Sequence, residues 1–139
     1  MKYLLDANVW LEAIVGGAHA HECRSLLTHA PAGSLATTDF SLHTAALILT
    51  PSNPAEFRIL LDDLTTLYIF TLHLTPSDLY SVLDGMSAHH LDFDDAFQYI
   101  AAERNDLQIV SFDSDFDRTP RGRVTPAQVL DTLRSQESE

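Results

Sequence analysis

Two short apolar segments of the sequence each run directly into acidic side chains. Residues 3–5 are followed by Asp6, and residues 107–112 are followed by Asp113 and Asp115. Ligands of open α/β sheets bind at the carboxyl ends of the strands, so two such segments predict one shared site. Carboxylate oxygens suit Mg²⁺ or Mn²⁺, and such an ion activates water and neutralises a phosphodiester. Taken alone, Asp6 or Asn8 is better explained as a cap of the next helix, and it is the second acidic segment that favours a shared site.

Asp94 and Asp95 lie in the first turn of a helix that is predicted to begin after Asp92. Acids at this place are favoured by the helix dipole, which is a purely structural explanation. The same helix N-terminus keeps a carboxylate ionised, as a metal ligand must be. Asp95 lies off the apolar stripe that contains Phe93 and Phe97, so its burial is not required.

Apolar periodicity and capping residues predict strands that alternate with helices. The strands are expected at 3–5, 34–37, 67–71 and 107–112, and the later helices are expected to begin after Thr38 or Asp39, Asn53, Thr75, Asp92 and Thr125. No two strands are adjacent as a hairpin, which indicates a mostly parallel sheet with helices on both faces. We therefore expect one three-layer α/β/α domain over residues 1–134, followed by a polar tail, 135–139, that frays.

Composition limits the class of protein further. The 139 residues carry a formal net charge of −12, which argues against binding nucleic acid by electrostatics alone. It leaves a nucleic-acid enzyme open, because metal-binding carboxylates count as negative until they are loaded. The single cysteine excludes a disulfide within the chain, and neither a signal peptide nor a membrane span is expected, so we expect a cytoplasmic protein.

Three arginines follow the second acidic segment, at Arg118, Arg121 and Arg123. A group of this kind is unremarkable as a bare surface charge. Beside a metal site these arginines could bind a phosphate, because the guanidinium group forms charge-assisted hydrogen bonds to phosphate oxygens.

Three motifs of the sequence together resemble those of PIN-domain ribonucleases. They are Leu4-Leu5-Asp6-Ala7-Asn8, the run from Leu91 to Ala102 that contains Asp94-Asp95, and the run Ile109-Val110-Ser111-Phe112-Asp113-Ser114-Asp115-Phe116. The most similar class is that of the VapC-type toxins of bacterial and archaeal toxin–antitoxin pairs. The resemblance covers residues 2–130, and the motifs are specific only in combination.

The resemblance implies a PIN-like fold and a metal-dependent endoribonuclease that acts on RNA with Mg²⁺ or Mn²⁺. It further implies a small antitoxin partner and a homodimer. In the implied site, the metal-binding acids are Asp6, Asp95 and Asp113. Asp115 is an accessory acid, and Asn8 and Ser111 are supporting polar residues. Arg118 or Arg121 would then steady the RNA backbone.

One position departs from the family pattern. The family usually carries a glutamate on the helix after the second strand, whereas residues 37–46 contain none. His43 stands approximately at that place, and Asp39 lies one helical turn earlier on the same face. Either residue could supply the missing ligand, the site could be degraded, or His43 could be a packed core histidine.

Two rival functions remain open. A non-catalytic PIN-like binding module is favoured by the missing glutamate and by the acidic charge. A phosphatase of the haloacid-dehalogenase type also has an aspartate after its first strand, but its chemistry requires a second aspartate two residues later. This chain has Asn8 there, and its only lysine is Lys2, so we rank the phosphatase well behind.

Overall fold

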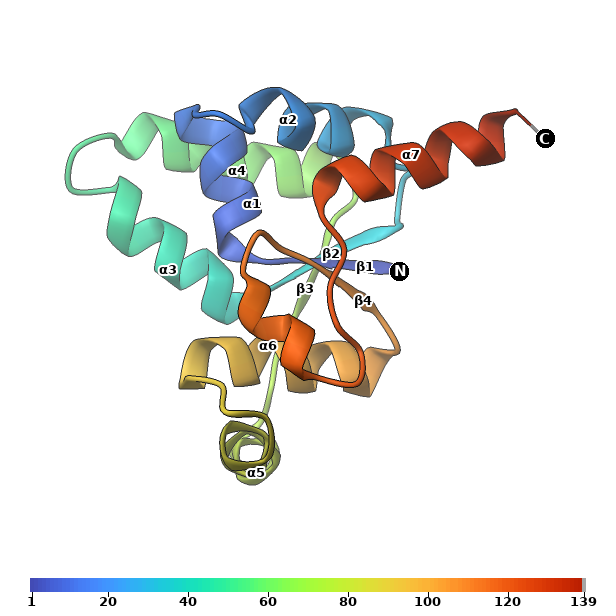
Figure 1. Ribbon diagram of the computed structural model, residues 1–139. Helices are drawn as coiled ribbons and strands as arrows, with labels where there is room; N and C mark the ends of the chain where they lie inside the picture. Colours follow the sequence, from blue (N-terminus) through green and yellow to red (C-terminus); the bar gives the residue numbers. More distant parts are fainter. Residues whose placement is uncertain (139) are drawn as a thin grey trace.

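The computed structural model describes residues 1–138 and shows a four-stranded sheet between two layers of helices (Figure 1). The strand order is β3-β2-β1-β4, and every neighbouring pair is parallel. The strands are short: β1 Tyr3–Leu5, β2 Leu35–Thr38, β3 Phe70–Leu72 and β4 Gln108–Val110. The predicted three-layer α/β/α architecture with a parallel sheet is therefore confirmed.

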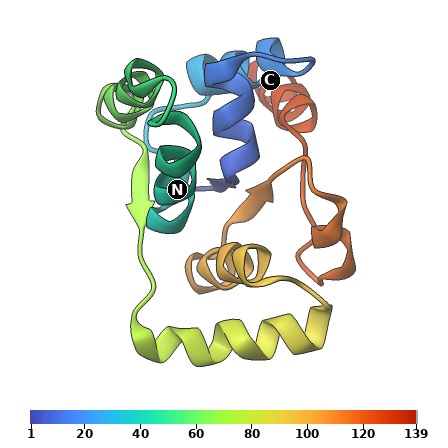
Figure 2. The same ribbon diagram turned by 90° about the vertical axis from the view of Figure 1, so that its left-hand side faces the viewer.

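Seven α-helices and two short 3₁₀ helices lie among the described residues. They are α1 Ala7–Val15, α2 Ala20–His29, α3 Asp39–Leu49, α4 Pro54–Thr66, η1 Pro76–Asp78, α5 Leu79–His89, α6 Phe93–Asn105, η2 Ser114–Arg118 and α7 Pro126–Glu137. Figures 1 and 2 show α1, α2, α4 and α7 on one side of the sheet, and α5 and α6 on the other.

The two sides of the sheet have separate apolar cores, because successive side chains of a strand point to opposite faces. In β1, Tyr3 and Leu5 pack into the core beneath α1, α2, α4 and α7. Leu4, between them, packs with Ile109 and the buried side chains of α6 on the other face. The alternation in a three-residue strand thus fixes which face each helix layer covers.

The order of the strands creates a switch point between β1 and β4. The chain moves outward from β1 through β2 to β3, and then crosses back to pair β4 with the other edge of β1. Because Leu5 lies opposite Val110, both strands end at the same edge of the sheet. The backbone N–H of Asp6 donates to the Val110 carbonyl at 3.0 Å, and this bond joins the two strand ends.

Side-chain caps begin several helices where the sequence predicts them. Thr38 accepts from the Ser41 N–H at α3, Asp92 accepts from the Asp95 N–H at α6, and Thr125 forms a capping box at α7. Asn53 precedes α4 as expected, although its side chain makes no capping hydrogen bond. These caps set where the helices start relative to the sheet edge.

Some boundaries differ from the predicted ones. The strand predicted at 67–71 is observed at Phe70–Leu72, because Leu67 still closes α4 and Tyr68 has a φ of 54°. The strand predicted at 107–112 shrinks to Gln108–Val110, because the Leu107 N–H bonds back to the last turn of α6. At the C-terminus, α7 continues to Glu137 through part of the expected tail, while Glu139 lies outside the described residues.

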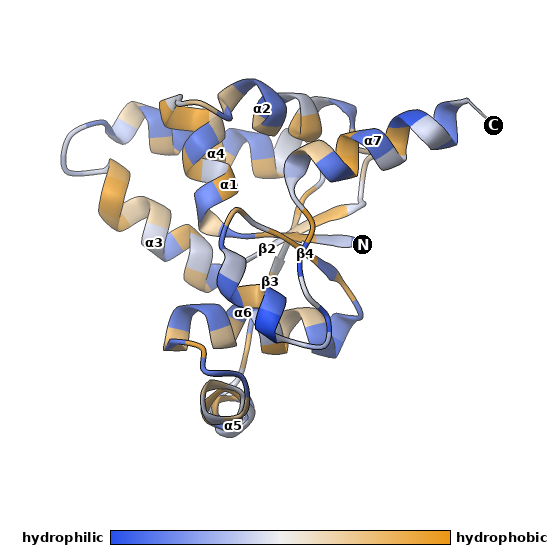
Figure 3. Ribbon diagram, in the orientation of Figure 1, coloured by the Kyte–Doolittle hydropathy of each residue, from blue (hydrophilic) through white to orange (hydrophobic). Residues whose placement is uncertain are grey.

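The hydropathy of the surface is uneven (Figure 3). The end of α3 is coloured hydrophobic, and there Leu47 is 78% exposed and Ile48 is 53% exposed. Two further apolar side chains, Ile59 and Leu61, are exposed on α4, which packs against α3. Within residues 1–138, no helix has the length and apolar composition needed to cross a bilayer.

The packing of α1 against α2 can be tested through Cys23, which is fully buried between them. Burial raises the pKa of the Cys23 thiol to about 12, and the charges of Glu12 and Glu22 add to this rise. At pH 8 the native thiol should therefore stay protonated and unreactive, since the thiolate is the nucleophile. We expect iodoacetamide to modify Cys23 only after unfolding in denaturant, as measured by mass spectrometry. Rapid labelling of the native protein would contradict this packing.

Candidate functional site

Asp6 stands at the carboxyl end of β1 and begins α1. Its side chain is only 6% exposed, and both oxygens accept hydrogen bonds: Oδ1 from the Ala7 N–H at 2.7 Å and Oδ2 from the Ser111 hydroxyl at 2.7 Å. Burial, with smaller contributions from the charges of Asp94 and Asp113, raises the pKa of Asp6 to about 6, although the two hydrogen bonds oppose the rise. The carboxylate is thus held in a fixed orientation although its charge is poorly solvated.

Ser111 follows β4 and connects the two strand ends through its fully buried hydroxyl. Besides donating to Asp6, the Ser111 Oγ accepts from Asn8 Nδ2 at 3.2 Å and from the Asp113 N–H at 3.0 Å. One hydroxyl therefore positions two side chains of the first motif, Asp6 and Asn8, and the backbone of Asp113. Both polar residues that the resemblance singles out, Asn8 and Ser111, lie beside Asp6.

Asp95, Asp113 and Asp115 come together although they belong to different elements. Each offers a carboxylate oxygen, and these oxygens all lie within 4.8 Å of one another. Asp95 is only 5% exposed. The sequence pattern did not require this residue to be buried, but the structure buries it. Burial raises the pKa of Asp95 well above its usual range, and the neighbouring charge of Asp113 raises it further. Asp113 caps η2 by accepting from the Asp115 N–H at 2.9 Å.

Asp94 is adjacent to Asp95 in sequence but lies outside this group of oxygens, and the sequence reasoning noted it without placing it in the site. Burial raises the pKa of Asp94, an interaction with the Gln98 side chain opposes this rise, and the charges of Asp92 and Asp113 add to it. Its charge also acts on Asp6, more strongly than the charge of Asp113 does. The signal in the sequence was its spacing of four residues from Gln98, which places both side chains on one face of α6.

The start of α3 supplies no carboxylate to this group. Asp39 is occupied elsewhere: its Oδ1 accepts from the Phe40 N–H at 2.8 Å, and its Oδ2 pairs with His73 Nδ1 at 3.0 Å. His43 is exposed on α3, so the interpretation as a packed core histidine is wrong. Neither residue belongs to the group of oxygens within 4.8 Å. Asp6 also lies outside that group, but its charge acts on Asp95.

The arginines after β4 are placed differently from one another. Arg118 pairs with Asp115 at 3.0 Å and is 46% exposed, so it lies at the open side of the acidic group. Arg121 instead donates to the Leu107 carbonyl and to Asp106, where it secures the start of β4. Arg123 donates to the Ser111 carbonyl at 3.2 Å. Arg118 is therefore the arginine placed to meet a ligand of this site, and Arg121 is not.

The donor set fits a hard divalent cation. Three buried side-chain oxygens lack a hydrogen-bond partner among the described residues, and all three belong to this group of residues: Asn8 Oδ1, Asp94 Oδ1 and Asp95 Oδ2. Buried polar atoms are normally satisfied, so three neighbouring exceptions indicate a ligand. Oxygen atoms of carboxylates and amides are those that Mg²⁺ and Mn²⁺ prefer.

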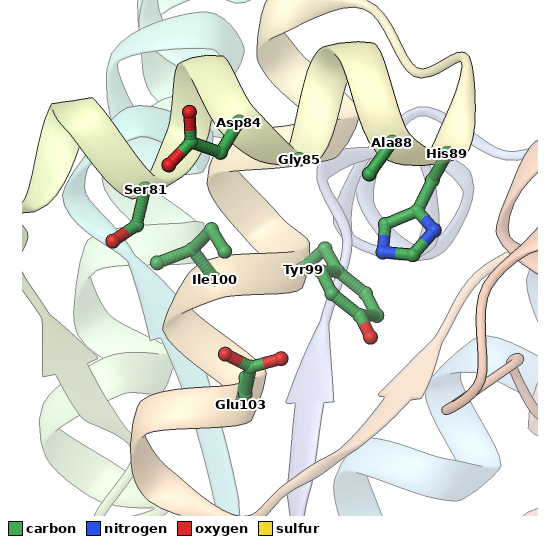
Figure 4. A pocket seen from close by; sticks show the side chains of 8 residues that line it. All are labelled: Ser81, Asp84, Gly85, Ala88, His89, Tyr99, Ile100 and Glu103. Carbon is green, nitrogen blue, oxygen red and sulfur yellow. The ribbon is translucent and has the colours of Figure 1, made fainter.

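A separate hollow of about 260 Å³ lies between α5 and α6 (Figure 4). Its walls are formed by Ser81, Asp84, Gly85, Ala88, His89, Tyr99, Ile100 and Glu103. The two carboxylates there, on facing helices, include none of the buried unsatisfied oxygens found in the described chain. The chemistry is therefore assigned to the acidic edge of the sheet and not to this hollow.

Comparisons with known proteins agree with this geometry. The protein-family model for the PIN domain matches residues 3–122. No match was found among curated proteins.

Solved structures with the same fold include the toxin–antitoxin complex from Klebsiella pneumoniae, with a TM-score of 0.74, 17% identity and coverage of 90% of this chain and 98% of that chain. They also include the sarcin–ricin loop cleaving toxin VapC20 from Mycobacterium tuberculosis, with a TM-score of 0.71, 19% identity and coverage of 84% and 93%. A third is VapBC2 from Rickettsia felis bound to a DNA fragment from its promoter, with a TM-score of 0.70, 15% identity and coverage of 89% of this chain and 97% of that chain. With a family model that spans most of its length and all three motifs at one sheet edge, the chain belongs to the PIN-domain family.

Proposed function

We propose that this protein is a divalent-metal-dependent endoribonuclease and the toxin of a toxin–antitoxin pair. The observation that carries the proposal is the convergence of Asp95, Asp113 and Asp115 within 4.8 Å, beside the hydrogen-bonded Asp6. Membership of the PIN-domain family supports a nuclease, and the toxin folds named above support the toxin role.

In this proposal, Asp6, Asp95, Asp113 and Asp115 hold Mg²⁺ or Mn²⁺. A bound cation of this type activates a water molecule and neutralises charge on the scissile phosphate. The protein contributes orientation: the Ser111 hydroxyl fixes the Asp6 carboxylate, and Arg118 binds a phosphate oxygen of the RNA backbone. The net charge of −12 makes this local pairing necessary, because the surface as a whole repels RNA.

A protein partner is supported by the apolar side chains exposed at the α3–α4 end of the molecule. Leu47, Ile48, Ile59 and Leu61 are each more than 40% exposed. Large apolar side chains exposed on two helices that pack together favour an interaction surface. We assign it to the small antitoxin or to a second copy of the chain in a homodimer, with the complex acting in the cytoplasm.

A non-catalytic PIN-like binding module is the second candidate. It is favoured by the start of α3, where Asp39 is paired with His73 and His43 is exposed, so that this helix adds no carboxylate to the group. The two candidates differ in whether metal loading leads to cleavage of RNA.

Our first prediction for this function concerns stabilisation by metal. Crowded carboxylates repel one another, so a cation that binds only the folded state should raise the melting temperature. We expect Mn²⁺ at 1 mM to raise the melting temperature of the wild-type protein by several degrees, measured by calorimetry. In Asp6→Asn most of this gain should disappear, and RNA cleavage should fall by more than ~100-fold.

The matched control is Asp131→Asn, on the exposed face of α7 and distant from the group. It should keep both the metal-induced gain and the cleavage activity. An unchanged gain in Asp6→Asn would reduce Asp6 to a helix cap. Full cleavage by Asp6→Asn would exclude the mechanism, and a metal-induced gain without any cleavage by the wild type would favour the binding module.

Our second prediction concerns Arg118. We expect Arg118→Gln to raise the KM for a single-stranded oligoribonucleotide about fivefold with little change in kcat, because a partly exposed charge contact contributes on the order of 1 kcal/mol. Arg134→Gln is a close control, since Arg134 pairs with Asp131 at the same i,i+3 spacing, 3.2 Å against 3.0 Å. Equal effects of the two substitutions would remove Arg118 from the RNA-binding surface.

A further inference from the structure

Asp94 lies in the first turn of α6 but does not cap the helix. The N-cap of the helix is Asp92, whose Oδ1 accepts from the Asp95 N–H at 2.9 Å. Asp94 makes no capping bond of its own, and its Oδ1 is buried without a partner. An acid that served only the helix dipole would gain by keeping its oxygens in water. The covered, unpaired oxygen therefore needs another explanation.

The direction of Asp94 follows from the next turn of the helix. Gln98, four residues later on the same face, is fully buried and donates to Thr38 Oγ1 at 3.0 Å and to Ser41 Oγ at 2.8 Å. These hydroxyls lie at the end of β2 and in the first turn of α3. Asp94 therefore faces the gap between α6 and the β2–α3 junction, where the described structure supplies hydroxyl groups and no carboxylate.

The same gap is bordered by the other acids. The negative charge of Asp94 acts on Asp6, and the charge of Asp113 acts on Asp94. An independent observation comes from Asp95, which is 5% exposed: its Oδ2 is also buried without a partner, and its carboxylate lies in the group formed with Asp113 and Asp115. Adjacent residues of α6 thus each have a buried oxygen without a partner, and the charge of Asp113 acts on both.

We propose that Asp94 is a further carboxylate ligand of the divalent-cation site, contributed by α6 to the side of the site that α3 leaves without an acid. The proposal rests on the proposed function, because it needs a cation between Asp6, Asp95 and Asp113. It assigns the two adjacent acids of α6 to the same site, with Asp95 on the Asp113 side and Asp94 on the Asp6 and α3 side.

The test measures Mn²⁺ binding directly on the full chain, by the loss of the free-ion electron paramagnetic resonance signal. We expect Asp94→Asn to weaken Mn²⁺ affinity tenfold or more. The matched control is Asp92→Asn, which removes the same charge two residues away while asparagine still caps the helix. Asp92→Asn should change the affinity less than threefold, and so should Asp39→Asn at the start of α3.

A second readout separates ligation from damage to the fold. Without metal, Asp94→Asn should melt at a higher temperature than the wild type at pH 7, because it removes a buried, unpaired charge next to Asp6. With Mn²⁺ the order should reverse. A lower melting temperature without metal, or an affinity equal to that of Asp92→Asn, would overturn the assignment of Asp94.

The two proposals fail differently. If the wild-type protein binds no Mn²⁺ at millimolar concentration, the proposed function fails and the role of Asp94 fails with it. If the wild type binds Mn²⁺ and Asp6→Asn does not, while Asp94→Asn binds like Asp92→Asn, only the role of Asp94 is overturned.

Discussion

Mutual repulsion of buried carboxylates is the constraint around which this structure is built. Asp6, Asp94, Asp95 and Asp113 lie at one sheet edge, and each of the first three has its pKa raised by burial and by the charge of at least one neighbour. No fold would collect these groups for stability alone, since each could be solvated on the surface. The two apolar cores must outweigh this repulsion, which is how strain is retained at a functional site.

Neutral groups hold the charged ones in place. The Ser111 hydroxyl joins Asp6, Asn8 and the Asp113 backbone, and Gln98 joins α6 to Thr38 and Ser41. These contacts add no further charge to a crowded region, yet each connects elements that are distant in sequence. Preorganisation by hydroxyl and amide groups therefore allows several carboxylates to remain close without competing for cationic partners.

Local signals predicted what depends on neighbours in sequence. The caps Thr38, Asp92 and Thr125 were predicted correctly because each of their hydrogen bonds spans only three residues. The pairing of Asp39 with His73 could not be predicted from the sequence. The two residues are 34 positions apart and meet only after β3 joins the sheet. The late start of β3 likewise depends on how α4 closes.

The placement of Asp94 could be only half predicted. Its spacing from Gln98 fixes a shared helix face, but the sequence does not say which element that face meets. The burial of Asp95 was missed for the same reason: α6 is buried almost all round, between the sheet and α5, so its apolar stripe is a poor guide to exposure. Tertiary packing decides such cases, not periodicity.

The adjacency of β1 and β4 also sets when the site can form during synthesis of the chain. The hydroxyl that orients Asp6 lies 105 residues further along, and Val124 pairs with β4 later still. A nascent chain that ends before β4 already contains Asp6, Asp94 and Asp95 and three of the four strands, but it lacks the Ser111 hydroxyl and the acids that follow β4. The cation site at this edge therefore cannot assemble until the chain has been synthesised at least as far as the segment that follows β4.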